Sequence, residues 1–337
     1  MSVKSYRQAI NEAIFQEMQR DETVIVMGED VAGGAGTGGE RDAWGGPLGV
    51  TKGLIGTFGH ARVLDTPISE AGYMGCAIGA AAAGLRPIAD LMFCDFIGVC
   101  FDQICNQAAK YRYTFGAQDR LPLTVRTMIG AGLSIASQHS QTLYPIFSYF
   151  AGLKVVIPSG PYDAKGLLIQ AIRDDDPVIF CEHKLLYEMT EDVPDEAYAI
   201  PFGEANLVRE GGDVTIVALS RMVHMASEAA ETLAQDGVEC EIIDPRTTTP
   251  LDDETILESV EATGRLVIVD ESGPRCGMAG DIAALVAEQA FGALKAPIAR
   301  VTPPHVPIPA APNLERAYVP DGPRVADAVR RVMAWQS

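Results

Sequence analysis

Long hydrophobic runs, paired cysteines and clustered basic residues are all missing from this sequence of 337 residues. No apolar run approaches the roughly 20 residues that a membrane-spanning helix requires. The seven cysteines include no C-x-x-C pair, which favours a reducing compartment over a disulfide framework and predicts a cytoplasmic protein. Lys and Arg number 26 against 45 Asp and Glu, and the net charge of −19 disfavours nucleic acid and membrane surfaces as partners.

Several standard catalytic motifs are also absent. There is no G-x-S-x-G, no H-E-x-x-H and no Walker loop, and the five histidines are scattered. Gly34, Gly36 and Gly39 satisfy G-x-G-x-x-G, but glycine and proline follow where a nucleotide-binding helix would begin. We therefore disfavour an NAD-binding oxidoreductase and interpret the glycine-rich segment 33–49 as a loop that faces the substrate.

The sequence does contain short β-branched runs that alternate with longer helical patterns. This alternation is typical of parallel sheets covered by helices, the α/β class, and the length favours two domains. An acidic, proline-containing segment interrupts the alternation after residue 190. We predict a first domain at residues 1–190, a linker at 191–205 and a smaller α/β domain at 206–337.

Individual elements can be placed from the same patterns. An amphipathic helix without the apolar region of a signal peptide opens the chain, with Tyr6, Ile10, Ile14 and Met18 on one side. Cys94, Cys100 and Cys105 fall in an apolar stretch and are expected in the core. The expected strands are 23–27, 62–65, 87–93, 123–126, 153–157, 178–182, 214–219, 238–244, 265–270 and 299–302.

Two segments carry candidate chemistry. In Ser69-Glu70, at the start of a helix rich in glycine and alanine, composition alone favours Ser69 as a helix cap and Glu70 as a complement to the helix dipole. The alternative is a functional carboxylate at the carboxyl edge of a sheet. His139 lies in a polar loop after the strand at 123–126, where catalytic groups collect, although a loop histidine can also simply be solvated.

A resemblance to a known family rests on DTPISEAGYMGCAIGAAAAGLRPIADLMF, FDQICNQAAKYRY, ASQHSQTLYP, GLKVVIPSGPYDAKGLLIQAIRDDDPVIFCEH and DPRTTTPLD. In order and spacing, over nearly the whole chain, these segments resemble beta subunits of 2-oxo acid dehydrogenase complexes. The segment GEDVAGGAGTGGERDAWGGPLGVTKGL looks most like the acetoin dehydrogenase member. The resemblance implies a pyrimidine-binding parallel-sheet domain for thiamine diphosphate, followed by a transketolase C-terminal-like domain.

The resemblance also implies roles for particular residues. Glu70 would hydrogen-bond the aminopyrimidine ring and activate the cofactor, with Glu29, Ile68 and Phe96 beside it. His139 would act on the bound intermediate or on acyl transfer to a lipoyl arm. A structural potassium ion would be held by the backbone carbonyls of Leu123, Ala171, Asp174 and Asp176.

Partners follow from the same resemblance. The sequence lacks the G-D-G and N-N signature for magnesium and the diphosphate, so an alpha subunit of an α2β2 heterotetramer would supply that half. We expect the enzyme to cleave acetoin and to transfer the acetyl group to lipoamide on an acyltransferase core.

Alternatives remain for the substrate and for the role of the chain. Either Val99 or Met92 stands where pyruvate-type or branched-chain-type members carry a glutamine near the pyrimidine, and such an apolar lining suits a neutral hydroxyketone. A pyruvate or branched-chain 2-oxo acid dehydrogenase beta subunit is the alternative. A chain that mainly docks the alpha subunit onto the acyltransferase is a second one.

Overall fold

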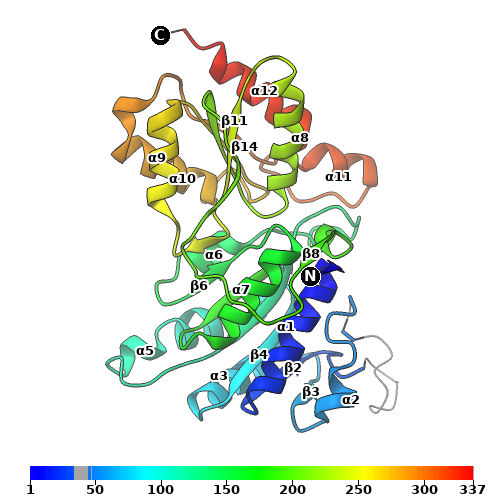
Figure 1. Ribbon diagram of the computed structural model, residues 1–337. Helices are drawn as coiled ribbons and strands as arrows, with labels where there is room; N and C mark the ends of the chain where they lie inside the picture. The colour runs from blue at the N-terminus through cyan, green and yellow to red at the C-terminus, as the bar shows by residue number, and fades with distance from the viewer. Residues whose placement is uncertain (34–44, 47, 337) are drawn as a thin grey trace. The chain divides into compact units, whose positions relative to one another are not determined.

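The computed structural model describes residues 1–33, 45–46 and 48–336, and the chain divides into two compact units (Figure 1). The first unit contains Met1–Ile129, Ile146–Glu182 and Leu186–Phe202. The second contains Gly130–Pro145, His183–Leu185 and the chain from Gly203 onward. Two short pieces of the predicted first domain, residues 1–190, therefore belong to the second unit. The division of the sequence into domains at 190–206 stays a prediction.

The first unit is built on a parallel sheet. Its strands lie in the order β6 (Lys154–Val156), β7 (Val178–His183), β5 (Thr124–Ile129), β4 (Arg86–Phe93), β2 (Val24–Gly28) and β3 (Val63–Asp65). The pairs β6 with β7, β5 with β4, and β2 with both β4 and β3 are parallel, so β5, β4, β2 and β3 share one carboxyl edge. The other elements are α1 (Tyr6–Arg20), α2 (Leu54–Phe58), α3 (Glu70–Ala82), α4 (Ile97–Phe101), α5 (Tyr111–Thr114), α6 (Tyr144–Ser148), α7 (Pro161–Arg173) and the antiparallel pair β1 (Ser2–Ser5) and β8 (Thr190–Val193).

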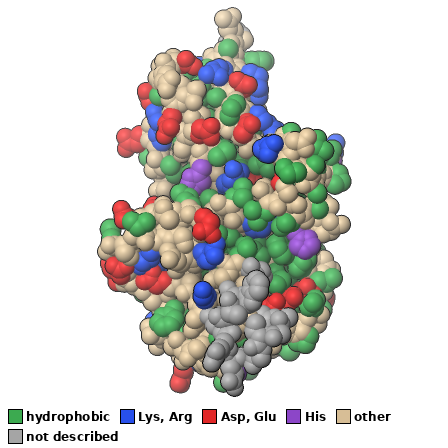
Figure 2. All heavy atoms as spheres, turned by 90° about the vertical axis from the view of Figure 1, so that its right-hand side faces the viewer, with side chains coloured by type: hydrophobic (Ala, Val, Ile, Leu, Met, Phe, Trp, Pro, Cys, Tyr) green, Lys and Arg blue, Asp and Glu red, His purple; other side chains and the backbone are tan. Residues whose placement is uncertain are grey.

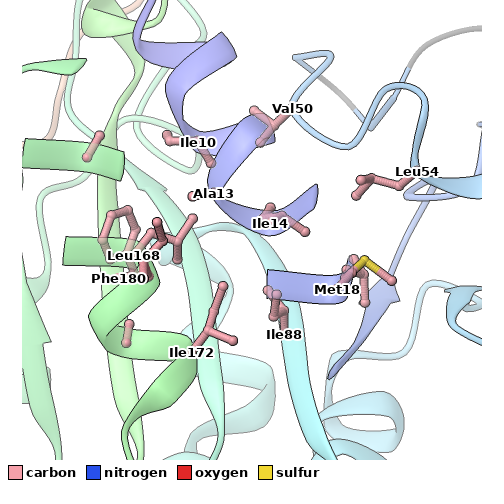
Figure 3. Packing of buried hydrophobic residues seen from close by; sticks show 14 of the residues in the cluster. Ile10, Ala13, Ile14, Met18, Val50, Leu54, Ile88, Leu168, Ile172 and Phe180 are labelled. Atoms are coloured by element: carbon pink, nitrogen blue, oxygen red, sulfur yellow. The ribbon is translucent and has the colours of Figure 1, made fainter. Parts of the chain in front are cut away.

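The core of the first unit lies between the sheet and the helices α1 and α7 (Figure 3). The predicted apolar side of α1 is confirmed, because Tyr6, Ile10, Ile14 and Met18 are at most 1% exposed. Ser5 begins this helix with a capping box, in which its hydroxyl and the Gln8 side chain satisfy each other's backbone N–H groups. Both the capping box at its start and the buried apolar side therefore favour a helix at α1.

The second unit is a smaller α/β unit. Its sheet has the order β14 (Ala299–Val301), β13 (Leu266–Val269), β10 (Val214–Ala218), β11 (Cys240–Asp244) and β9 (Asn206–Arg209). The first four strands are parallel and β9 is antiparallel to β11. The remaining elements are β12 (Thr247–Thr249), α8 (Met222–Ala234), α9 (Asp253–Thr263), α10 (Met278–Gln289), α11 (Pro312–Tyr318) and α12 (Gly322–Met333).

The α/β class predicted from the sequence is confirmed, and the longer strands lie where the alternation placed them. The strands β1, β8, β9 and β12 are not predicted from the sequence, because they are short and carry no sustained apolar run. Cys94, Cys100 and Cys105 are fully buried as predicted, and all seven cysteines are free thiols. Across the described ranges, no helix combines the length and the apolar character needed to span a bilayer.

Candidate active site

The predicted residues Glu29, Glu70 and Phe96 follow three neighbouring strands. Glu29 comes directly after β2, Glu70 opens α3 after β3, and Phe96 lies just beyond β4. Because β3, β2 and β4 are adjacent and parallel, their carboxyl ends meet at one edge of the sheet. Ligands of α/β folds bind at this edge, so the fold gathers residues that are distant in the sequence.

Glu70 is half-buried as the first residue of α3. Ser69 precedes the helix, but its side chain makes no capping hydrogen bond, so the interpretation of Ser69 as a side-chain cap is wrong. Tyr73 lies one turn further along α3, and its buried hydroxyl donates to the Asp90 carbonyl of β4 at 3.1 Å. That bond fixes the first turn of α3, and with it Glu70, against the sheet.

Glu29 and Glu70 lie close enough for their charges to interact. Burial first, and then the charges of Asp30 and Glu70, raise the pKa of Glu29. Burial and then the Glu70 charge also raise the pKa of the Cys100 thiol, on α4, to about 12. The charge of the Glu70 carboxylate therefore raises pKa values both at the end of β2 and on α4. The Glu29 carboxyl holds a proton more readily than an isolated carboxyl group does.

The surroundings of Glu70 combine exposed apolar groups with an unsatisfied hydroxyl. Ile68 is 76% exposed and Val99 is 59% exposed. Half-buried Phe96 packs edge-on against Phe93, with ring centroids 5.5 Å apart. The Thr66 hydroxyl is buried without a hydrogen-bond partner. A bound ring with an apolar face and a polar edge fits this combination, because it would cover the apolar groups and engage the polar ones.

His139 belongs to the second unit and is not among the residues that the first unit gathers. It is half-buried in the segment between β5 and α6, and its backbone carbonyl accepts a hydrogen bond from the Lys184 ammonium group. The following hydroxyls of Ser140 and Thr142 are buried without a partner. Buried hydroxyls without a hydrogen-bond partner, close to His139 in the sequence, are consistent with a segment that binds another molecule through them.

The four predicted potassium-binding residues occupy the region around the end of α7. The Asp174 carbonyl accepts a hydrogen bond from the Arg86 guanidinium at 2.9 Å, and the Lys154 ammonium lies 2.7 Å from the Asp174 carboxylate and 3.2 Å from that of Asp176. In the described parts of the chain, no cluster of three or more His, Cys, Asp or Glu side chains could hold a metal ion. A potassium site would therefore depend on main-chain carbonyls, those of Leu123, Ala171, Asp174 and Asp176.

A buried ionic network centred on Arg126 was not predicted from the sequence. Arg126 is 3% exposed and donates to Glu182 at 2.6 and 2.7 Å and to Asp90 at 2.9 Å. Tyr187 donates to Glu182 at 2.6 Å, and burial raises the pKa of Asp90 although Arg126 opposes the shift. An arginine inside the apolar run TVRTMI was the available signal, because a buried cation requires acidic partners.

This network borders a small pocket in the first unit. Asp90, Arg126 and Tyr187 line it, together with Gly45, Gly46, Leu48, Val50 and Met128. Gly45 and Gly46 of the glycine-rich segment therefore line the same pocket as the charged side chains of Asp90 and Arg126. The positions Gly34, Gly36 and Gly39 lie outside the described residues.

Comparisons with known proteins agree with this architecture. Residues 2–190 match the pyrimidine-binding domain of transketolase, and residues 203–325 match the transketolase C-terminal domain. A solved split-gene transketolase, described as an inactive beta4 tetramer, has a similar fold with a TM-score of 0.80 at 22% identity over 99% of both chains. The protein is thus of the two-domain transketolase-like class.

Closer relatives define the family. The beta subunit of acetoin:2,6-dichlorophenolindophenol oxidoreductase from Cupriavidus necator is 63% identical, over 98% of this chain and 97% of the relative. The corresponding subunit from Bacillus subtilis is 54% identical over 98% and 97%. A pyruvate dehydrogenase E1 beta subunit from Rickettsia felis is 46% identical over 97% of each chain. The chain belongs to this family of dehydrogenase beta subunits.

Proposed function

We propose that the chain is the beta subunit of a thiamine diphosphate-dependent oxidoreductase that cleaves acetoin and transfers the acetyl group to lipoamide. The observation that carries this proposal is the 63% identity, along nearly the full length, to a subunit named for acetoin oxidation. The apolar residues Met92 and Val99 near the site agree with a neutral hydroxyketone. A 2-oxo acid such as pyruvate is the alternative, since the pyruvate-type relative is 46% identical.

The residues at the sheet edge suit the aminopyrimidine half of thiamine diphosphate. When bound, this cofactor supplies a carbon nucleophile that breaks the bond next to a carbonyl group. Glu70 would accept and return a proton at the ring nitrogen, and Glu29 would lie beside the cofactor as a second acidic group. Phe96 and Ile68 would cover the ring and exclude water from it.

The diphosphate and its magnesium ion would be held by an alpha subunit, in an α2β2 heterotetramer that serves a lipoyl-bearing acyltransferase. Exposed apolar side chains of the first unit favour such a partner, because Ile68, Val99 and Phe101 are 76%, 59% and 40% exposed. Figure 2 shows hydrophobic side chains gathered in patches between acidic and basic ones on one face of the molecule. We also propose the potassium site named above, the division of the chain at 190–206 and a cytoplasmic location.

The substrate can be tested with the chain co-purified with its alpha partner, thiamine diphosphate and magnesium. Acetoin, pyruvate and 3-methyl-2-oxobutanoate are compared by kcat/KM with dichlorophenolindophenol as electron acceptor. We expect acetoin to give the highest value. A preference for either 2-oxo acid would refute the proposed substrate and leave the cofactor assignment in place.

Substitution of Glu70 separates catalysis from a docking role. Glu70→Gln removes the ionisable proton carrier but keeps the side-chain size, so we expect turnover to fall on the order of 100-fold or more. Assembly with the alpha subunit, measured by size-exclusion chromatography, should be unchanged. Glu22→Gln, at an exposed glutamate after α1, is the matched control and should keep full turnover. Normal turnover of Glu70→Gln would support a chain that only docks its partners.

A further inference from the structure

The segment that carries His139 is held through its backbone by buried carboxylates of the second unit. The Ala131 amide donates to Glu271 at 2.7 Å. Glu315 of α11 accepts from the Gly132 amide at 2.8 Å, from the Ser134 amide at 2.9 Å and from the Ser134 hydroxyl at 3.0 Å. Glu271 and Glu315 are only 5% and 3% exposed. Three donors from one short stretch therefore converge on a single buried glutamate.

The hydrogen bonds to Glu315 can form only when the loop adopts this conformation. A buried carboxylate is costly unless donors compensate its charge, and within the described residues those of Glu315 come from Gly132 and Ser134. Ser134 and Ala136 have φ angles of 56° and 66°, a left-handed conformation that non-glycine residues rarely adopt. The interactions that hold such a backbone must come from elsewhere in the fold, and Glu315 supplies them.

The loop is fixed at its other end as well. The Lys184 ammonium, which is 4% exposed, donates to the backbone carbonyl of His139 itself. The neighbouring His183 donates from Nε2 to Glu271 over 2.9 Å, because its Nδ1 accepts the Leu185 amide at 3.2 Å. Glu271, Glu315 and Lys184 thus hold the start, the middle and the end of the segment that positions His139.

We propose that Glu315 is a positioning residue for His139: its carboxylate fixes the backbone from Gly132 to Ser134 and so sets where the imidazole is presented. This inference rests on the proposed function, in which His139 acts on the bound intermediate or on acyl transfer. Glu315 touches no reacting atom in this scheme. Its effect on turnover passes through His139, and that dependence can be measured.

A double-mutant cycle with the assembled enzyme tests the proposal. Glu315→Ala, Glu315→Gln, His139→Ala and the two double variants are compared in acetoin-dependent acetylation of a lipoyl domain. We expect Glu315→Ala to lower kcat on the order of 100-fold, because small displacements of a catalytic group are that costly. The KM for acetoin should change little. Glu315→Gln keeps one acceptor oxygen and should be impaired less.

The decisive comparison is made in the His139→Ala background, where we expect Glu315→Ala to cause no further loss. Coupled residues are non-additive in this way, whereas a general loss of structure would lower the rate by the same factor in both backgrounds. Additive effects would overturn the proposal, and so would normal turnover of both Glu315 variants. If His139→Ala itself retained full activity, the assumed role of His139 in the proposed function would be refuted instead.

Asp252 offers a matched control in the same unit. Its carboxylate also receives three donors, the Ala205 amide at 2.8 Å, the Thr255 amide at 3.1 Å and the Thr255 hydroxyl at 2.8 Å. Asp252→Ala should lower the melting temperature and give the same modest change in kcat with or without His139. Circular dichroism and size-exclusion chromatography check that each variant folds and assembles.

Discussion

Removal of the buried Arg126 guanidinium should destabilise the first unit strongly. Arg126→Met keeps an unbranched apolar stem but deletes three charge-assisted hydrogen bonds, two to Glu182 and one to Asp90. Glu182 and Asp90 are 0% and 7% exposed, so both carboxylates would stay buried without their cation. Breaking such a pair costs about 3–5 kcal/mol, because the remaining charge is uncompensated. For a unit of this size the melting temperature should fall by roughly 10 °C.

Differential scanning calorimetry at neutral pH measures this change. Arg112→Met is the matched control, because Arg112 forms a similar ion pair with Asp176 at 2.6 Å but lies at the surface, where the melting temperature should hardly change. The pH dependence gives a second check. Burial already raises the pKa of Asp90, and the loss of Arg126 raises it further, so protonation should relieve the destabilisation as the pH falls. Equal melting temperatures for Arg126→Met and Arg112→Met would refute this reasoning.

Two further predictions concern thiols and acid stability. Maleimide should modify Cys76 and Cys276, which are exposed, and should leave the buried thiols intact until the protein unfolds; peptide mass spectrometry that finds labelled Cys100 in the native protein would contradict the described packing. Burial raises the pKa of Glu271, but the His183 interaction and the Ala131 amide outweigh it, so the net pKa is lowered. Its ionised form therefore stabilises the fold above its unfolded-state pKa, and that stability is lost as the pH falls through the lower folded-state value. Glu271→Gln should flatten the acid side of the plot of melting temperature against pH, and an unchanged slope would contradict the assignment.

The sequence predicted the elements whose patterns are longest. The apolar side of α1 was recognisable because its buried residues repeat with the helical period, and the strand at 87–93 was recognisable as a short apolar run buried on both faces. The short strands β1 and β9 were missed, since their stability comes from pairing with distant segments and not from their own residues. Pairing partners in a sheet cannot be read from local periodicity.

In the candidate site, too, some residues could be predicted from the sequence and others depend on contacts between distant segments. Glu70 was found through resemblance, and only the strand order places it beside Glu29. The interpretation of Ser69 as a side-chain cap was wrong, because the favourable residue type does not fix the side-chain direction that a cap requires. Glu315 could not have been singled out, since its partners lie about 180 residues earlier in the chain and only the fold brings them to its carboxylate.

The interrupted course of the second unit has a consequence for truncated genes. A fragment that begins at Gly203 would include every strand of that unit's sheet, β9, β10, β11, β13 and β14. It would nevertheless leave out Gly130–Pro145 and His183–Leu185, and with them the amides that compensate Glu271 and Glu315. Recombination between relatives at the apparent domain border would exchange Glu271 and Glu315 without the loop at 130–145 whose amides bind them. Successful chimeras of this family should therefore inherit residues 130–145 together with the chain from Gly203 onward.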